Sequence, residues 1–143
     1  NDVDAVSSPA TKREINRKEL DYNILIKAIG DPETLTSKII HSMNALITVR
    51  TKQSAFHPNG AQDILIIQPE IFAVLRTSPD TDQHILSLIN VTDDEIQVTI
   101  PMKTINIPKQ KWYDLISQDM YTFKEEEISL TLKPYDVVWL EPQ

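Results

Sequence analysis

The spacing of apolar residues changes once along this chain, from a helical period to a strand period. Leu20 and Ile24 stand four positions apart, as residues on one face of a helix do. Asn16 precedes them as an N-cap residue, and Gly30 follows them as a typical helix stop. The pattern predicts a helix over residues 17–29.

A second helical pattern starts in the segment "GDPETL". Asp31 suits an N-cap, and Pro32 suits the first helical position. Apolar residues then recur at spacings of three and four as far as Arg50, which predicts a helix over residues 32–52. Its apolar stripe is wide, so we expect this helix to pack on something larger than a short neighbouring helix.

The second half of the chain alternates apolar and polar positions, as β-strands with one buried face do. Eight short segments show the pattern, separated by turn-forming runs that contain Pro and Asp. The segments are "DILIIQ", "IFAVLRT", "QHILSLIN", "EIQVTI", "KWYDLI", "MYTF", "EISLTL" and "DVVWLEP". This spacing of strands and turns predicts an antiparallel β-sandwich.

Helices followed only by strands give an α+β order rather than repeated βαβ units. We place a domain boundary between residues 1–54 and residues 55–143. The strands can bury a core of their own, whereas two amphipathic helices leave apolar surface exposed. The chain also begins with Asn1 rather than methionine. We therefore expect a piece of a longer protein whose missing part precedes the helices.

Charge and composition exclude several classes of partner and of site. With 143 residues and a formal net charge of −7, the chain lacks the basic footprint of a general nucleic-acid binder. It contains no cysteine, so disulfides and thiolate metal sites are excluded. No apolar run approaches the roughly 20 residues that span a bilayer, and no signal-peptide pattern is present. We expect no membrane partner and a cytoplasmic location.

The side chains that could carry chemistry form no catalytic or metal-binding motif. His41 and His84 lack ligands at metal-binding spacing, and His57 suits a structural role, holding the loop before the strands to the preceding helix. The acidic run 93–95 has no calcium-loop pattern and favours a solvated turn. The aromatic residues fit a sandwich core better than a sugar-stacking platform. We therefore predict no catalytic residue, cofactor or metal in this chain.

Several cations stand at the start of the first predicted helix. Arg13, Arg17 and Lys18 oppose the helix dipole there, which costs stability unless acidic partners or anions face them. An arginine fork suits hydroxyl pairs, carboxylates and phosphate. Two interpretations stay open, a solvated helix start and one part of a binding site.

The motifs "KREINR" (residues 12–17) and "AFHPN" (55–59), with the tail "LKPYDVVWLEP", resemble the C-terminal part of the sucrose phosphorylase group. This group belongs to glycoside hydrolase family 13, the α-amylase superfamily. The resemblance implies that the helices end a (β/α)8 barrel and that an antiparallel β-domain follows. It also implies that Arg13 lines the glucosyl subsite, and that Asn16 and Arg17 support its loop. Lys12 departs from the glycine that is frequent in the group.

The resemblance implies retaining glucosyl transfer through an aspartate nucleophile and a glutamate acid/base. Both carboxylates precede Asn1 in such enzymes, so the chain alone is expected to be inert. The implied partners are the missing barrel polypeptide, a sucrose- or glucosylglycerate-like sugar and inorganic phosphate. The segment "AFHPN" favours the glucosylglycerate branch. Two alternatives stay open: a stand-alone carbohydrate-binding or structural β-module, and the tail of an amylase-type hydrolase.

Overall fold

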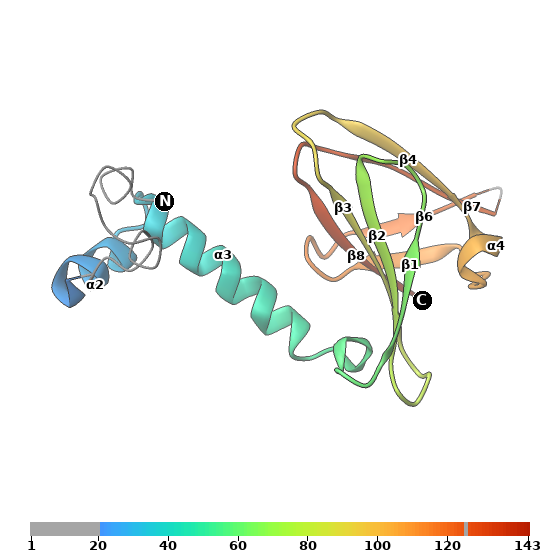
Figure 1. The fold of residues 1–143 in the computed structure, drawn as a ribbon, viewed down its shortest axis with the longest axis horizontal. Helices are drawn as coiled ribbons and strands as arrows, with labels where there is room; N and C mark the ends of the chain where they lie inside the picture. Colours follow the sequence, from blue (N-terminus) through green and yellow to red (C-terminus); the bar gives the residue numbers. More distant parts are fainter. Residues whose placement is uncertain (1–20, 125) are drawn as a thin grey trace, which may run out of the picture. The chain divides into compact units, whose positions relative to one another are not determined.

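The computed structural model describes residues 21–124 and 126–143. The chain forms two compact units, Asn1–Asn44 and Ala45–Gln143, and each is described by itself (Figure 1). The boundary predicted from the sequence, between residues 1–54 and 55–143, separates the end of a catalytic barrel from the β-domain. This boundary stays a prediction.

The first described helix, α2 (Tyr22–Gly30), begins later than the pattern predicted. Its N-cap is Asp21, whose Oδ1 accepts hydrogen bonds from the backbone nitrogens of Asn23 at 2.8 Å and Ile24 at 3.2 Å. Asp and Asn are equally good N-cap residues. The predicted start at residue 17 is therefore wrong for α2, and Asn16 lies outside the described residues.

The second helix, α3 (Leu35–Arg50), also begins later than predicted. Asp31 accepts a hydrogen bond from the backbone nitrogen of Glu33 at 3.0 Å, which holds Pro32 in a turn rather than in the helix. The hydroxyl of Thr34 then caps α3 by accepting from the backbone nitrogen of Ser37 at 3.1 Å.

An apolar stripe runs along α3 and remains exposed. Leu35, Ile39, Met43 and Ile47 follow one another at intervals of four, and about half or more of each side chain is accessible to solvent. Residues at this spacing share one face of a helix. The stripe predicted from the sequence is therefore present on the helix surface.

The second unit begins with the last turns of α3, passes through a single 3-10 turn, η1 (Ser54–Phe56), and continues as antiparallel strands. All eight predicted strands are present. They are β1 (Ala61–Leu65), β2 (Ile71–Thr77), β3 (His84–Asn90), β4 (Ile96–Pro101), β5 (Lys111–Asp114), β6 (Met120–Thr122), β7 (Glu127–Leu132) and β8 (Val137–Pro142). One short helix that the pattern did not predict, α4 (Met102–Ile105), follows β4.

The strands form two sheets of unequal size. The larger has the order β1-β2-β3-β8-β5-β6, and the smaller pairs β4 with β7. Alternate side chains of both sheets meet in one core, which includes Leu86, Leu88, Val98, Ile128 and Leu140. The predicted fold class, helices followed by an antiparallel β-domain, is confirmed.

Asn90 holds two turns of the β-domain together at the end of β3. Its side-chain amide donates to the carbonyl oxygens of Asp94 at 2.7 Å and Lys133 at 2.9 Å. Its carbonyl accepts from both the backbone nitrogen and the hydroxyl of Thr92, at 3.0 and 2.7 Å. Asn90 is only 1% exposed, so water molecules cannot readily take over these hydrogen bonds.

We predict that Asn90→Ala lowers the free energy of unfolding by about 2–3 kcal/mol, because buried carbonyls and amides lose their partners. Urea unfolding measures the loss. The matched control is Gln97→Ala on an exposed position of β4, with an expected change within about 0.5 kcal/mol. Equal stability of the two variants would contradict the assigned role of Asn90.

Candidate functional site

The residues predicted to contact sugar lie outside the described part of the chain. Arg13, Asn16 and Arg17 all belong to residues 1–20. The described residues instead define how the "AFHPN" motif connects a helix to the β-domain.

Residues 53–60, called the junction from here on, are fixed to β2 by one guanidinium. Arg76 donates from Nε to the carbonyl oxygen of Ala55 at 3.1 Å and from Nη2 to that of His57 at 2.8 Å. Its Nη1 donates to Oε1 of Gln62 on β1 at 2.8 Å. Ala55 is fully buried beneath these contacts. Arg76 thereby satisfies backbone acceptors that the irregular junction cannot pair within itself.

The side chain of Gln83 fixes the junction from a second direction. Its Oε1 accepts from the backbone nitrogen of Ala55 at 2.9 Å and from the Ser54 hydroxyl at 3.2 Å. Its Nε2 donates to Oε1 of Gln53 at 2.7 Å and to Oε1 of Glu141 on β8 at 2.6 Å. Both the oxygen and the nitrogen of the Gln83 amide therefore form hydrogen bonds, and together these bonds link the junction to β8.

A tight turn before β3 positions Gln83. The Ser78 hydroxyl accepts from the backbone nitrogens of Asp82 at 3.1 Å and Gln83 at 3.0 Å, and it donates to the Asp82 carboxylate. This donation is the main reason that the pKa of Asp82 lies below its ordinary value. The turn is thus held together most strongly while Asp82 is ionised.

Two ring contacts and one glycine complete the junction. The ring centroids of Phe56 and Trp139 are 4.8 Å apart, and the guanidinium carbon of Arg50 lies 4.7 Å from the Phe56 centroid. At Gly60, an added Cβ would lie 2.6 Å from the carbonyl oxygen of Thr77. Only glycine allows the backbone to approach β2 this closely.

The three histidines take local roles. His57 Nδ1 accepts from the backbone nitrogen of Asn59 at 3.1 Å, so it holds its own loop rather than joining loop to helix. His41 Nδ1 lies 2.8 Å from the Ser37 carbonyl oxygen, and His84 Nδ1 lies 3.1 Å from the Thr77 hydroxyl. Within residues 21–124 and 126–143, no group of three His, Cys, Asp or Glu side chains could hold a metal ion.

The aromatic residues divide between core and surface. Trp112 is fully buried and donates from Nε1 to the Lys109 carbonyl oxygen at 2.6 Å, whereas Tyr135 is 66% exposed. Trp139 packs against Phe56, as described above. Tyr121 stacks on Phe123, and burial together with nearby carboxylates raises the pKa of its phenol. The expectation that most of these rings fill the core or its edges agrees with these positions.

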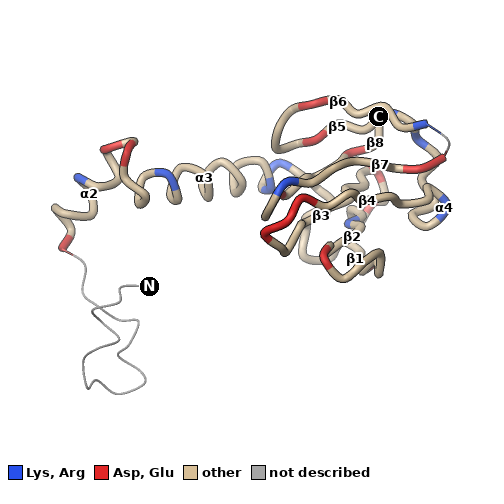
Figure 2. The backbone as a smooth tube through the Cα atoms, turned by 90° about the horizontal axis from the view of Figure 1, so that it is seen from above, with Lys and Arg blue, Asp and Glu red and all other residues tan. Residues whose placement is uncertain are grey.

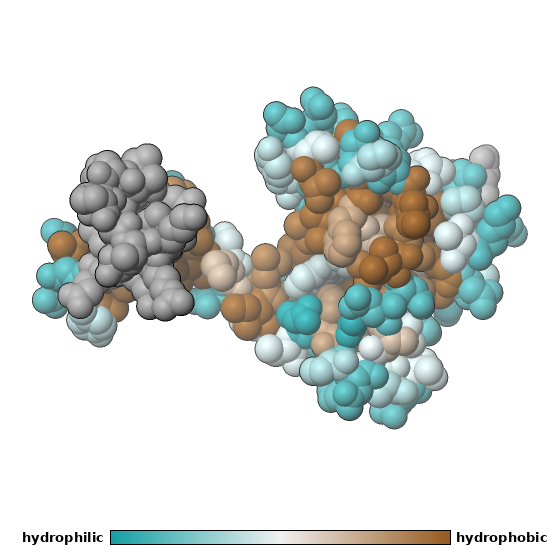
Figure 3. All heavy atoms as spheres, in the orientation of Figure 1, coloured by the Kyte–Doolittle hydropathy of each residue, from teal (hydrophilic) through white to brown (hydrophobic). Residues whose placement is uncertain are grey.

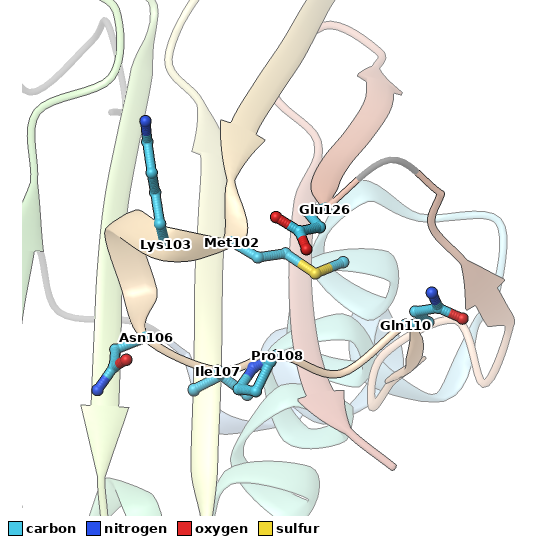
Figure 4. Close-up of a pocket in the computed structure, with 7 residues that line it drawn as sticks. All are labelled: Met102, Lys103, Asn106, Ile107, Pro108, Gln110 and Glu126. Carbon is cyan, nitrogen blue, oxygen red and sulfur yellow. The ribbon is translucent and has the colours of Figure 1, made fainter.

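A hollow of about 270 Å³ opens beside α4 (Figure 4). Met102 and Ile107 contribute apolar surface, while Asn106, Gln110 and Glu126 contribute polar groups. Lys103 extends away from the other labelled side chains. Among the described residues that line the hollow, none is aromatic.

The β-domain of this chain matches a known protein family. Residues 65–139 match the family described as maltogenic amylase, C-terminal domain, and this match covers more than half of the chain. The chain belongs to this family. Its resemblance to the C-terminal part of sucrose phosphorylase-like enzymes in the α-amylase superfamily is thereby confirmed.

Two curated relatives match nearly the whole chain. The glucosylglycerate phosphorylase of Spirochaeta thermophila is 32% identical, over 97% of this chain and 24% of the relative. The glucosylglycerate phosphorylase of Escherichia coli is 27% identical, over 99% of this chain and 23% of the relative. The chain thus spans about a quarter of the length of these relatives.

Two solved structures share the fold. An Anoxybacillus α-amylase has a TM-score of 0.63 at 17% identity, over 78% of this chain and 24% of that one. AmyP in complex with maltose has a TM-score of 0.60 at 17% identity, over 67% of this chain and 18% of that one. No helix in the described part of the chain is long and apolar enough to cross a membrane.

Sequence reasoning missed Arg76 and Gln83 as the residues that hold the junction. The one available signal for Arg76 was a charged residue inside the otherwise apolar strand "IFAVLRT". Gln83 gave no signal, because a glutamine just before a strand is common in turns and at strand ends.

We predict that Gln83→Ala lowers the free energy of unfolding by about 2 kcal/mol and speeds hydrogen exchange at the Ala55 amide, which loses its acceptor. Gln97→Ala on the exposed side of β4 is the control and should leave that exchange rate unchanged. An unaltered Ala55 rate in Gln83→Ala would show that the amide is protected by something else.

Proposed function

We propose that this chain is the C-terminal portion of a retaining α-glucoside phosphorylase, which transfers a glucosyl unit to inorganic phosphate. The observation that carries the proposal is the 32% identity to a glucosylglycerate phosphorylase over 97% of the chain. The similarity extends through both helices and the β-domain, not only through the C-terminal domain that amylases share.

A glucosylglycerate-like donor fits this chain better than sucrose. Three curated relatives bear the name glucosylglycerate phosphorylase, at 32%, 27% and 30% identity. The segment "AFHPN" favours the same branch. In our proposal the donor is therefore a glucosyl unit linked to a small hydroxy acid, and the leaving group is a glycerate-like anion.

The catalytic carboxylates belong, in this proposal, to the part of the parent enzyme that precedes the chain. The curated relatives carry about three quarters of their length outside the matched part, which is room for a catalytic barrel. An aspartate there forms the covalent glucosyl intermediate, and a glutamate protonates the leaving oxygen and later activates the acceptor. The chain alone is then inert.

The exposed apolar stripe of α3 supports the proposal that a catalytic barrel precedes this chain. Leu35, Ile39, Met43 and Ile47 present an apolar face to solvent, which a helix of an intact globular protein normally buries. We infer that α2 and α3 are the last helices of a (β/α)8 barrel, and that this face packs on the barrel polypeptide.

Arg13, Asn16 and Arg17 are the proposed contribution of this chain to the sugar site. A guanidinium can donate two parallel hydrogen bonds to neighbouring hydroxyls or to a carboxylate that orients them. We propose that Arg13 binds the non-reducing end of the glucosyl unit, and that Asn16 and Arg17 support the loop that carries it.

The full-length enzyme tests the reaction. Incubated with glucosylglycerate, it should release glucose 1-phosphate only when inorganic phosphate is present, because phosphate replaces water as the acceptor. Release of free glucose at the same rate with and without phosphate would contradict the proposal. That result would identify the parent as an amylase-type hydrolase.

For the sugar site, we predict that Arg13→Ala in the full-length enzyme lowers kcat/KM at least about tenfold, equivalent to about 1.4 kcal/mol of transition-state binding. Lys18→Ala removes the same charge nearby and is the matched control, with kinetics close to those of the unmodified enzyme. Unchanged kcat/KM in Arg13→Ala would remove Arg13 from the subsite.

A further inference from the structure

The junction ends with the dipeptide Asn59-Gly60, directly before β1. The chain has two glycines, and Gly60 is the one that follows an asparagine. An asparagine before glycine is especially prone to deamidation, because glycine has no side chain that hinders attack by its own backbone nitrogen. Asn59 is exposed. Figure 3, in the orientation of Figure 1, shows a mostly hydrophilic surface around the loop that follows η1, so water has access to this pair.

The fold holds both residues in one turn. The backbone nitrogen of Gly60 donates to the carbonyl oxygen of His57 at 2.9 Å, and that of Asn59 donates to His57 Nδ1 at 3.1 Å. Pro58 is the second residue of this turn, and Asn59, the third, has no positive φ, which identifies a type I turn. The same His57 oxygen accepts from Nη2 of Arg76 at 2.8 Å. Arg76 therefore fixes the acceptor that fixes the Gly60 amide.

Deamidation at this pair would proceed through a cyclic imide. The Gly60 nitrogen gives up its proton and forms a bond to Cγ of Asn59, and the side-chain nitrogen leaves with a proton as ammonia. Water then adds to the imide. Breaking the new bond between nitrogen and Cγ gives aspartate, whereas breaking the original peptide bond gives isoaspartate, in which the backbone runs through Cγ.

The turn holds the attacking nitrogen in the wrong place for ring closure. In a type I turn the third residue has ψ at about 0°, so the Gly60 nitrogen eclipses the backbone nitrogen of Asn59 and points away from its Cβ. Ring closure requires rotation about the Cα–C bond of Asn59. This rotation breaks the hydrogen bond from Gly60 to His57. The reaction therefore has to wait for the junction to open locally.

The aspartate product leaves the path of the backbone unchanged. It adds one carboxylate to residues 53–60, which contain no Asp or Glu. Arg50 is the last residue of α3 and Lys52 follows it, and Figure 2 shows basic residues in blue at this end of the helix. We expect the junction to tolerate this product.

The isoaspartate product lengthens the backbone by one carbon directly before Gly60. An added Cβ at Gly60 would lie 2.6 Å from the carbonyl oxygen of Thr77 and 3.1 Å from that of His57. The chain therefore has no room to shift at this point. With isoaspartate at position 59, the junction cannot keep both the close approach of Gly60 to β2 and the hydrogen bonds of the turn.

We propose that Asn59 is a site of spontaneous deamidation, and that opening of the junction sets the rate of the reaction. While Arg76 and His57 hold the Gly60 amide, attack is suppressed. Once the junction opens, the imide forms, and the isoaspartate product prevents the junction from closing again. The reaction needs water as its co-reactant, and the proposal does not rest on the function assigned to the parent enzyme.

Ageing of the full-length protein in mildly alkaline buffer, followed by peptide mapping with mass spectrometry, tests the proposal. We expect Asn59 to convert at least about tenfold more slowly in the folded protein than in the same protein unfolded in urea. Arg76→Lys keeps the charge but loses the forked set of hydrogen bonds, and it should raise the rate in the folded protein several-fold. Gln97→Ala on β4 is the matched control. Asn23, which precedes Ile24, is the internal control and should stay unconverted.

Refolding separates the effects of the two products. After ageing in urea and removal of urea, isoaspartate should be enriched in the fraction that fails to refold, whereas Asn59→Asp should refold like the unmodified protein. Equal conversion rates in folded and unfolded protein, absence of conversion in both, or an unchanged rate in Arg76→Lys would overturn the proposal. An equal share of isoaspartate in the refolded and failed fractions would do the same. Peptide mapping needs no turnover, so these results are independent of the phosphate dependence of the reaction.

Discussion

The guanidinium of Arg76 is the interaction on which the arrangement of the second unit depends. It reaches back to carbonyl oxygens 19 and 21 residues earlier in the chain, in a segment with no regular secondary structure of its own beyond one turn. Backbone acceptors in such a segment must find partners if they are to be buried. Gln83 completes the set from the turn before β3, and Phe56 adds a ring contact with Trp139 on β8. A short irregular segment therefore gains one defined path across the sheet.

This arrangement gives the "AFHPN" motif a physical meaning. Ala55 is small enough to be fully buried between Arg76 and Gln83, and Phe56 supplies the ring that packs on Trp139. His57 then holds the following loop, and Gly60 lets the chain approach β2. A motif first noticed as a family resemblance is thus also a set of steric and hydrogen-bonding requirements. In this chain the motif has a structural role. The catalytic residues proposed for the parent enzyme belong to other segments.

Local pattern predicted strands such as β4 and β7 because buried and more exposed positions alternate along them. It misplaced both helix starts, because Asp21 and Thr34 cap as well as the nearby residues that were chosen. The four-residue helix α4 is too short to show a period. The roles of Arg76 and Gln83 depend on partners 14 to 58 residues away, which spacing cannot reveal. Arg13, Asn16 and Arg17 were assigned a role by resemblance, and they lie outside the described residues.

The strand order has a consequence for how the domain folds. In the large sheet, β8 lies between β3 and β5, so the β5-β6 pair joins the rest of that sheet only through the last strand in sequence order. Folding must therefore close a loop of some fifty residues between β3 and β8 before the sheet is continuous, and such non-local pairing is slow. Until it occurs, β3 presents an unpaired edge with several apolar side chains. A growing or truncated polypeptide that lacks β8 is then the form most exposed to misassociation.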